Sequence, residues 1–227
     1  MAAFFLWKNY SKQFGIILAT FFVFLCVLYG VYISRTIIVP YQASFYLLTY
    51  SKMNVEAGTQ FVKLEGGAGY LWEIEGKEYV VAAIYKKRQE AEIVCLSLKG
   101  AGEPYCVQSV DVENLYFKGR DKKKRDMYIS ALNTFRGYID VIMHCISNLD
   151  TGGTQERIKN VLSMACRQIQ GLSKQYTEEY SSFVYLCYNI VELLQGVEEG
   201  VIYSSDLRYI SCEMLNGYLE LCNQFSL

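Results

Sequence analysis

The residue types that most often carry out catalysis or bind metal ions are sparse in this 227-residue chain. It contains one histidine, His144, so a site that needs two imidazoles cannot form within one chain. The eight cysteines include no Cys-x-x-Cys pair, the spacing of zinc ribbons and thioredoxin-like redox sites. The sequence has no glycine-rich phosphate loop and no Gly-x-Ser-x-Gly nucleophile elbow. It therefore predicts a protein that is not an enzyme and that holds no metal ion or other cofactor.

Three glutamates raise the alternative of a hydrolase, which needs a paired acid and base in a cleft. Glu73, Glu75 and Glu78 lie close together in the sequence, around Gly76-Lys77. Because Gly-Lys between two apolar runs is typical of a hairpin, these carboxylates are more simply solvated side chains of a turn. The cysteines mostly stand beside apolar residues and are expected to pack as small apolar side chains, although some could pair in an oxidising compartment.

The elements that would position any site begin with an alternation of strands and helices. Aromatic and β-branched runs predict strands, and apolar residues at helical spacing predict helices. The expected strands are 41–50, 69–75, 78–85 and 104–112, and the expected helices are 55–65 and 86–99. This β-α-β-β-α-β order predicts an α+β, ferredoxin-like domain of two layers, with both helices on one face of the sheet.

Short motifs in this region resemble the SPOR (sporulation-related repeat) domain family. They are Gln42-Ala43-Ser44-Phe45 in the first strand, Glu78-Tyr79-Val80-Val81-Ala82-Ala83-Ile84-Tyr85 in the third, and Gln89-Glu90-Ala91 opening the second helix. The family pattern is Gln-x-Gly-x-Phe, then Tyr-x-Val-x-x-Gly-x-Tyr, then a helix that contains alanine. The resemblance covers residues 40–112, and Ser44 and Ala83 stand where the family has glycines.

The resemblance implies binding of bacterial peptidoglycan, in particular of glycan strands stripped of their peptide stems at division or spore-forming septa. A sugar chain needs aromatic faces for its C–H surfaces and neutral amides or hydroxyls for its rims. Alternation along the first strand puts one set of polar and aromatic side chains on the face opposite the helices, and the third strand adds tyrosines to it. The expected ligand-binding residues are Gln42, Ser44, Tyr46, Trp72, Tyr79 and Tyr85. The alternative is that Trp72, Tyr79 and Tyr85 are core or sheet-covering residues.

An apolar segment precedes these elements. Residues 13–34 contain no charged side chain, and about 20 apolar residues in a helix span a bilayer. A cleaved signal peptide is the alternative, but no small-x-small pattern stands before Arg35. Because Lys8 and Lys12 precede the segment, the positive-inside bias predicts a single-pass cell-membrane protein whose C-terminal part is extracytoplasmic.

The C-terminal part changes to a helical period and predicts an antiparallel helical bundle. One apolar stripe consists of Leu132, Phe135, Ile139, Ile142, Ile146 and Leu149. The charge run at 118–125 contains no apolar side chain and is expected to be an exposed linker. The predicted division is a cytoplasmic stub and transmembrane helix at 1–35, a SPOR-like domain at 36–117, the linker at 118–125 and the bundle at 126–227.

The charge balance limits the partners. With 22 Lys and Arg against 23 Asp and Glu, the chain lacks the positive excess that nucleic-acid binding requires. The predicted function is that of a membrane-anchored envelope protein that binds peptidoglycan, in cell division or sporulation, with the bundle available to envelope protein partners. The alternative is a non-catalytic interaction scaffold of the same machinery whose sheet does not bind glycan.

Overall fold

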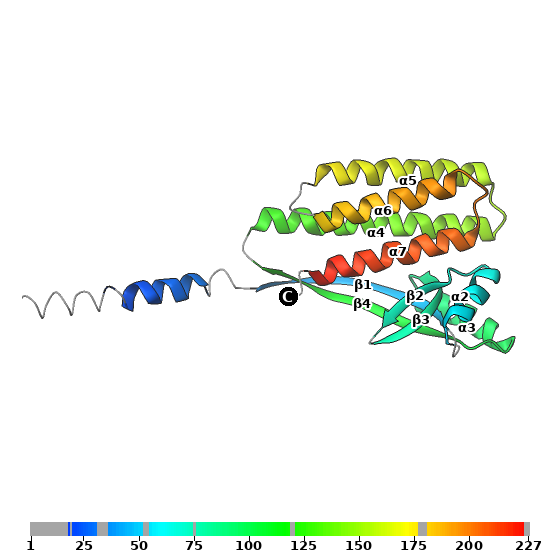
Figure 1. The fold of residues 1–227 in the computed structure, drawn as a ribbon, viewed down its shortest axis with the longest axis horizontal. Coiled ribbons are helices and arrows are strands. Elements are labelled where there is room, and N and C mark those ends of the chain that lie inside the picture. The colour runs from blue at the N-terminus through cyan, green and yellow to red at the C-terminus, as the bar shows by residue number, and fades with distance from the viewer. Residues whose placement is uncertain are drawn as a thin grey trace, which may run out of the picture.

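The fold combines a four-stranded sheet with seven helices among the residues that the structure describes. The computed structural model describes residues 18, 20–30, 36–51, 55–74, 76–118, 121–176 and 181–224. After helical residues at 20–30, the chain forms β1 (Thr36–Tyr50), α2 (Val55–Leu64), β2 (Tyr70–Ile74), β3 (Lys77–Tyr85), α3 (Arg88–Gly100) and β4 (Tyr105–Lys118). Four long helices follow, namely α4 (Lys122–Asp150), α5 (Gln155–Gln175), α6 (Ser181–Glu198) and α7 (Ser204–Gln224). Figure 1 shows these four helices side by side above the sheet.

The sheet is antiparallel, with the strand order β2-β3-β1-β4. β1 and β4 are the longest strands, and they pair from Thr36 opposite Lys118 to Tyr50 opposite Tyr105. β3 pairs with β1 only over the last part of β1, from Tyr46 to Tyr50. Before Tyr46, β1 and β4 therefore continue alone as a two-stranded ribbon.

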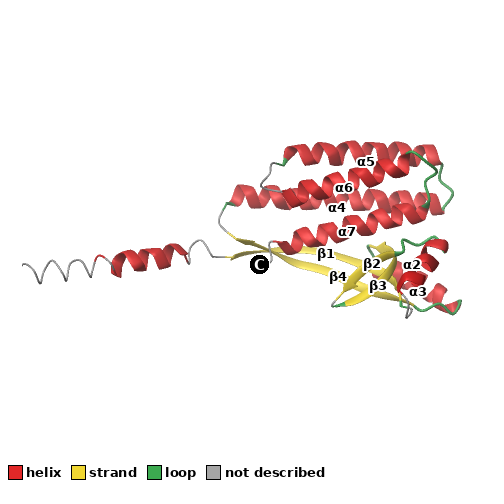
Figure 2. Ribbon diagram, in the orientation of Figure 1, coloured by secondary structure: helices red, strands yellow, loops and turns green. Residues whose placement is uncertain are grey.

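Helices cover the two faces of the sheet to different extents. α2 and α3 pack on one face at one end of the sheet, around Leu48, Tyr50 and Val80. The bundle packs along the other face, and α4 and α7 lie next to the strands (Figure 2). Phe45 of β1 meets Tyr218 of α7 edge to face, with ring centroids 6.0 Å apart. One continuous hydrophobic core therefore contains residues of the sheet and of all four bundle helices.

The predicted fold class is wrong in how the layers are arranged. The sequence predicted a two-layer, ferredoxin-like domain with an open sheet face, followed by a separate bundle. Instead, strands in the order β2-β3-β1-β4 form the middle of three layers. The face that carries Ala43, Phe45 and Leu47 is apolar, and burying it against the bundle removes that surface from water. The α+β composition remains as described above.

The expected membrane span must also be corrected. Of the expected segment 13–34, the structure describes residues 18 and 20–30, and its other residues lie outside the described part. No helix in the described part of the chain is both long enough and apolar enough to cross a membrane. The prediction of a single-pass cell-membrane protein with an extracytoplasmic C-terminal part is therefore not supported.

Half of the expected charged linker at 118–125 is helical, and its residues 119 and 120 lie outside the described part. Asp121 caps α4, because its side chain accepts a hydrogen bond from the backbone N–H of Lys124 at 3.0 Å. Lys122 to Arg125 thus form the first turn of α4, and Lys118 ends β4. The apolar stripe that starts at Leu132 is the face that α4 buries.

Candidate functional site

The ribbon formed by β1 and β4 has one buried face and one open face. Tyr41, Ala43 and Phe45 point toward the bundle. The side chains between them point the other way, toward the side of the sheet that carries α2 and α3, and Arg88 of α3 lies near Tyr46. We call this open surface the ribbon face; it consists of Ile38, Gln42, Ser44 and Tyr46 from β1 and Ser109, Asp111, Asn114 and Tyr116 from β4.

The pairing of the two strands brings the members of the ribbon face together. Ser44 lies opposite Asp111, Tyr46 opposite Ser109, and Ile38 opposite Tyr116. Directly paired side chains in a sheet have Cβ atoms about 5 Å apart. The strand rises about 3.3 Å per residue, so the eight steps from Ile38 to Tyr46 extend about 26 Å. The result is an elongated, shallow surface with aromatic rings near both ends.

The ribbon face is mainly neutral. Its amides and hydroxyls come from Gln42, Ser44, Ser109 and Asn114, and Asp111 is the charged member of the set, followed in β4 by the exposed Glu113. Ile38 is 58% exposed, so this face also offers apolar surface to a partner. Such a surface can accept and donate hydrogen bonds and stack with flat apolar groups, but it has no pair of groups arranged for proton transfer.

The structure keeps four of the six expected ligand-binding residues on one side of the sheet. Gln42, Ser44 and Tyr46 belong to the ribbon face, and Tyr85 of β3 lies opposite Tyr46. Burial raises the pKa of Tyr85, while the Arg208 guanidinium opposes that rise. However, this is the side that also carries α2 and α3, whereas the expected binding face was the opposite one.

The other two expected residues, Trp72 and Tyr79, lie on the bundle side. They are directly paired across β2 and β3. Trp72 is only 8% exposed and meets Tyr70 edge to face at 5.8 Å, and Tyr70 in turn meets Tyr209 of α7 at 5.3 Å. Trp72 is therefore a core residue, as in the alternative interpretation, and it does not join the ribbon face.

The sequence analysis missed the contribution of β4. It ended the last strand at residue 112, but β4 continues to Lys118 and adds Asn114 and Tyr116 to the ribbon face. The pairing of β1 with β4 is irregular between Pro40 and Ala43, and this irregularity breaks the period-two pattern. Leu115 and Phe117 are apolar and two residues apart, and this spacing could have indicated that the strand continues.

The cysteines and acids form no reactive centre in the described part of the chain. There, no three His, Cys, Asp or Glu side chains come together as metal ligands. All eight cysteines are free, and six of them are buried. Burial raises the pKa of Cys187 to about 12 and that of Cys222 to about 12, which keeps these thiols protonated near neutral pH.

Comparison with known proteins adds no relative. The chain matches no family model, no curated protein and no solved structure. The resemblance to the SPOR domain therefore rests on the short motifs of this sequence alone.

Proposed function

We propose that this chain is a non-catalytic binding protein that holds a glycan strand of peptidoglycan along the ribbon face. The observation that carries the proposal is the composition of that open face, in which tyrosine rings accompany neutral amides and hydroxyls. Tyrosine rings pack against the C–H faces of sugars, and the amides and hydroxyls of Gln42, Ser44 and Asn114 bond their hydroxyl and acetamido groups.

The shape of the ribbon face also favours an extended ligand. A strand-long, shallow surface suits a linear polymer better than a compact small molecule, which generally binds in a concave pocket. The bundle stabilises this surface from behind, since Tyr218 donates a hydrogen bond to the Tyr41 hydroxyl at 2.8 Å and Arg136 donates one to the Gln42 carbonyl at 3.0 Å. The backbone that presents Gln42 is thus held in place without using its side chain.

The test is co-sedimentation of the full chain with purified peptidoglycan, both intact and after an amidase has removed the stem peptides. The expected result is pelleting that increases after amidase treatment, because stems no longer shield the glycan. Tyr46→Ala and Tyr116→Ala should each weaken binding by about 5- to 150-fold, the usual effect of removing an aromatic contact worth about 1–3 kcal/mol.

Tyr185→Ala is the matched control. Tyr185 is a tyrosine of α6 that is 68% exposed and lies outside the ribbon face, so its removal should leave pelleting unchanged. The proposal fails if the folded protein does not pellet with either preparation, or if the ribbon-face variants and Tyr185→Ala behave alike.

A second candidate function is the non-catalytic interaction scaffold, and one observation favours it. A groove of about 430 Å³ runs between α6 and α7. Its lining residues are Ser181, Ser182, Tyr185, Leu186, Asn189, Glu213, Asn216, Gly217, Glu220 and Leu221. The groove combines apolar, amide and acidic groups, and no lysine or arginine lines it. This composition is suited to binding a segment of another protein. Unchanged localisation at the cell wall in Gln42→Ala, Tyr46→Ala and Tyr85→Ala variants would favour this function over glycan binding.

A further inference from the structure

The first turn of α4 consists of four consecutive cations, from Lys122 to Arg125. The side chains of Lys122 and Lys123 are exposed, and neither forms an ion pair within the described part of the chain. Cations are unfavourable at this end of a helix, because the helix dipole is positive there, and the turn itself contains no acid. The charge of this turn therefore does not stabilise α4, and it is available to an anionic partner.

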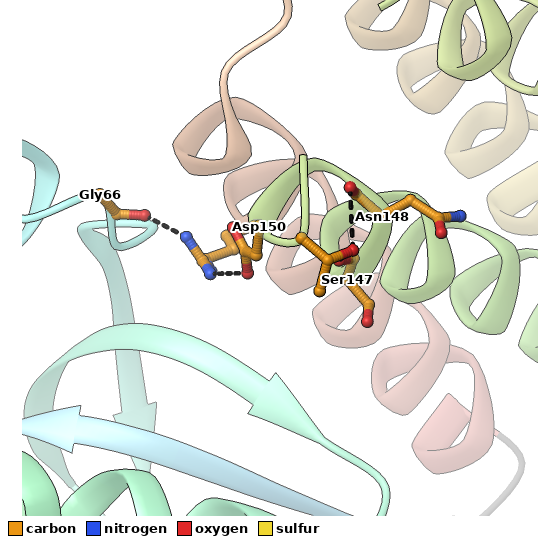
Figure 3. A network of polar contacts seen from close by, with 6 residues as sticks. Gly66, Ser147, Asn148 and Asp150 are labelled. Atoms are coloured by element: carbon orange, nitrogen blue, oxygen red, sulfur yellow. Dashed lines mark hydrogen bonds and ion pairs between the residues drawn. The ribbon is translucent and has the colours of Figure 1, made fainter. Parts of the chain in front are cut away.

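α4 is held against α7 near both of its ends. At the C-terminal end of α4, the Arg208 guanidinium of α7 donates hydrogen bonds to the Asp150 carboxylate and to the Gly66 carbonyl (Figure 3). Toward the start of α4, the Tyr128 hydroxyl donates a hydrogen bond to the Leu221 carbonyl of α7 at 2.9 Å. The two helices are therefore antiparallel, and their packing fixes the direction in which the first turn of α4 points.

The start of α4 projects beyond the part that α7 covers. α4 has 29 residues, whereas α7 has 21 and ends at Gln224. Figure 1 shows the first turns of α4 extending past the end of α7 and the start of α6. We call residues 122–127 the α4 arm, which is about 9 Å long at a rise of about 1.5 Å per residue. Its last residue, Met127, is 39% exposed, so the arm also offers apolar surface.

The groove between α6 and α7 is complementary to the α4 arm in charge and in length. Its acids are Glu213, which is half-buried, and Glu220, which is exposed. Neither acid forms an ion pair within the described residues, and no lysine or arginine lines the groove. The part of α6 that lines it, from Ser181 to Asn189, is about 12 Å long. A short helical segment that carries lysines therefore suits this groove.

The α4 arm and the groove lie at the same end of the bundle. Leu221, whose carbonyl bonds Tyr128, lines the groove next to Glu220, so the end of the groove adjoins the base of the arm. Two copies related by a two-fold axis at this junction can each place an arm in the groove of the other. Because the two contacts are identical by symmetry, both form at once.

We propose that the chain forms a two-fold homodimer in which the α4 arm of each copy lies in the groove between α6 and α7 of the other. The lysines of the arm donate hydrogen bonds to Glu213 and Glu220, and Met127 packs on the apolar part of the groove. The proposal names the occupant of the groove on which the second candidate function rests, and it does not depend on glycan binding. Because its contacts are charged, the dimer should weaken as the ionic strength rises.

The test is sedimentation velocity of the full chain and of charge-reversed variants. The unmodified chain should sediment as a dimer. Lys122→Glu combined with Lys123→Glu should weaken dimer formation about tenfold or more, and so should Glu220→Lys, because like charges then meet in both copies of the contact. The matched controls are Lys99→Glu at the end of α3 and Glu199→Lys after α6, which reverse exposed charges elsewhere and should leave the dimer intact.

A mixture of the arm variant and the groove variant gives the sharpest result. In a mixed dimer, the reversed arm faces the reversed groove, and the two unmodified surfaces face each other. The mixture should therefore form a heterodimer although neither variant dimerises alone. A variant that merely folds poorly would not be rescued in this way.

Three results would overturn the inference. The first is a monomeric unmodified chain, and the proposed function would stand if that monomer still pelleted with peptidoglycan. The second is a dimer that the charge reversals do not weaken, as expected of association through the apolar residues at 20–30. The third is a mixture that forms no heterodimer, because the α4 arm would then serve a different anionic partner.

Discussion

Replacing Trp72 by alanine separates the observed arrangement of layers from an open sheet face. On an open face, Trp72 would be exposed, and its removal would change the free energy of unfolding by no more than about 0.5 kcal/mol. In the structure it is 8% exposed and lies in a chain of aromatic contacts that reaches Tyr209 of the bundle through Tyr70. A buried aromatic side chain removes about 150–250 Å² from water, equivalent to about 4–6 kcal/mol at about 25 cal/mol per Å².

The expected loss for Trp72→Ala is therefore about 3–5 kcal/mol, in line with other large-to-small substitutions in cores. The assay is urea denaturation followed by far-UV circular dichroism, which does not depend on tryptophan fluorescence. Leu71→Ala is the matched control, because Leu71 is the neighbouring strand residue and is 51% exposed. A loss below about 1 kcal/mol for Trp72→Ala, or equal losses for the two variants, would refute the reasoning.

Three further predictions concern the bundle and the buried side chains. A Cβ on Gly217 would clash with Cδ1 of Leu186, so Gly217→Ala should lower the free energy of unfolding by about 1–3 kcal/mol. Gly196→Ala, with nothing within 4 Å of the added Cβ, should instead raise it by up to about 1 kcal/mol in the same denaturation assay. At pH 8, a thiol reagent should label Cys26 and Cys106 in the native chain and all eight cysteines after denaturation; fast labelling of more than two native thiols would contradict the burial. The contribution of three buried groups to the free energy of unfolding should be complete below about pH 9 and should fall as the pH rises toward 12. The reason is that these thiols and this phenol lose their protons at lower pH in the unfolded chain than in the folded chain, and a flat profile from pH 9 to 12 would contradict this. The side chains concerned are Cys187, Cys222 and Tyr105.

The elements that were predicted well are those whose signal is local. The apolar residues of α4 recur every three or four positions, and such a period is sufficient to indicate both a helix and its buried face. Likewise, alternation along β1 correctly grouped Gln42, Ser44 and Tyr46, since successive strand side chains point to opposite faces.

Alternation does not say which partner covers each face. Both faces of β1 become apolar toward its end, where Leu47 points to the bundle and Leu48 to α2 and α3. The choice is made by contacts between distant parts of the chain, such as Phe45 with Tyr218, and a local pattern contains no information about them. The open binding face was therefore assigned to the wrong side, and Trp72 was expected on the surface.

The irregular pairing of β1 and β4 limited the prediction of the candidate site in the same way. The charged residues Asp111 and Glu113 interrupt the apolar pattern of β4, so the local pattern predicts a strand that ends at residue 112. The pairing partner of its last part, the start of β1, lies about 80 residues earlier in the chain. Asn114 and Tyr116 become visible as site residues only when the two strands are paired.

The hydrogen bond between the Tyr218 and Tyr41 hydroxyls joins residues that are 177 positions apart, and this separation has a consequence for folding during synthesis. When the sheet strands leave the ribosome, the helix that completes the cover of their apolar face has not yet been made. Closing so long a loop slows folding, and the uncovered face of β1 and β4 is meanwhile open to association with other chains. A chain that stops before α7 should therefore aggregate or be degraded instead of forming a smaller stable domain.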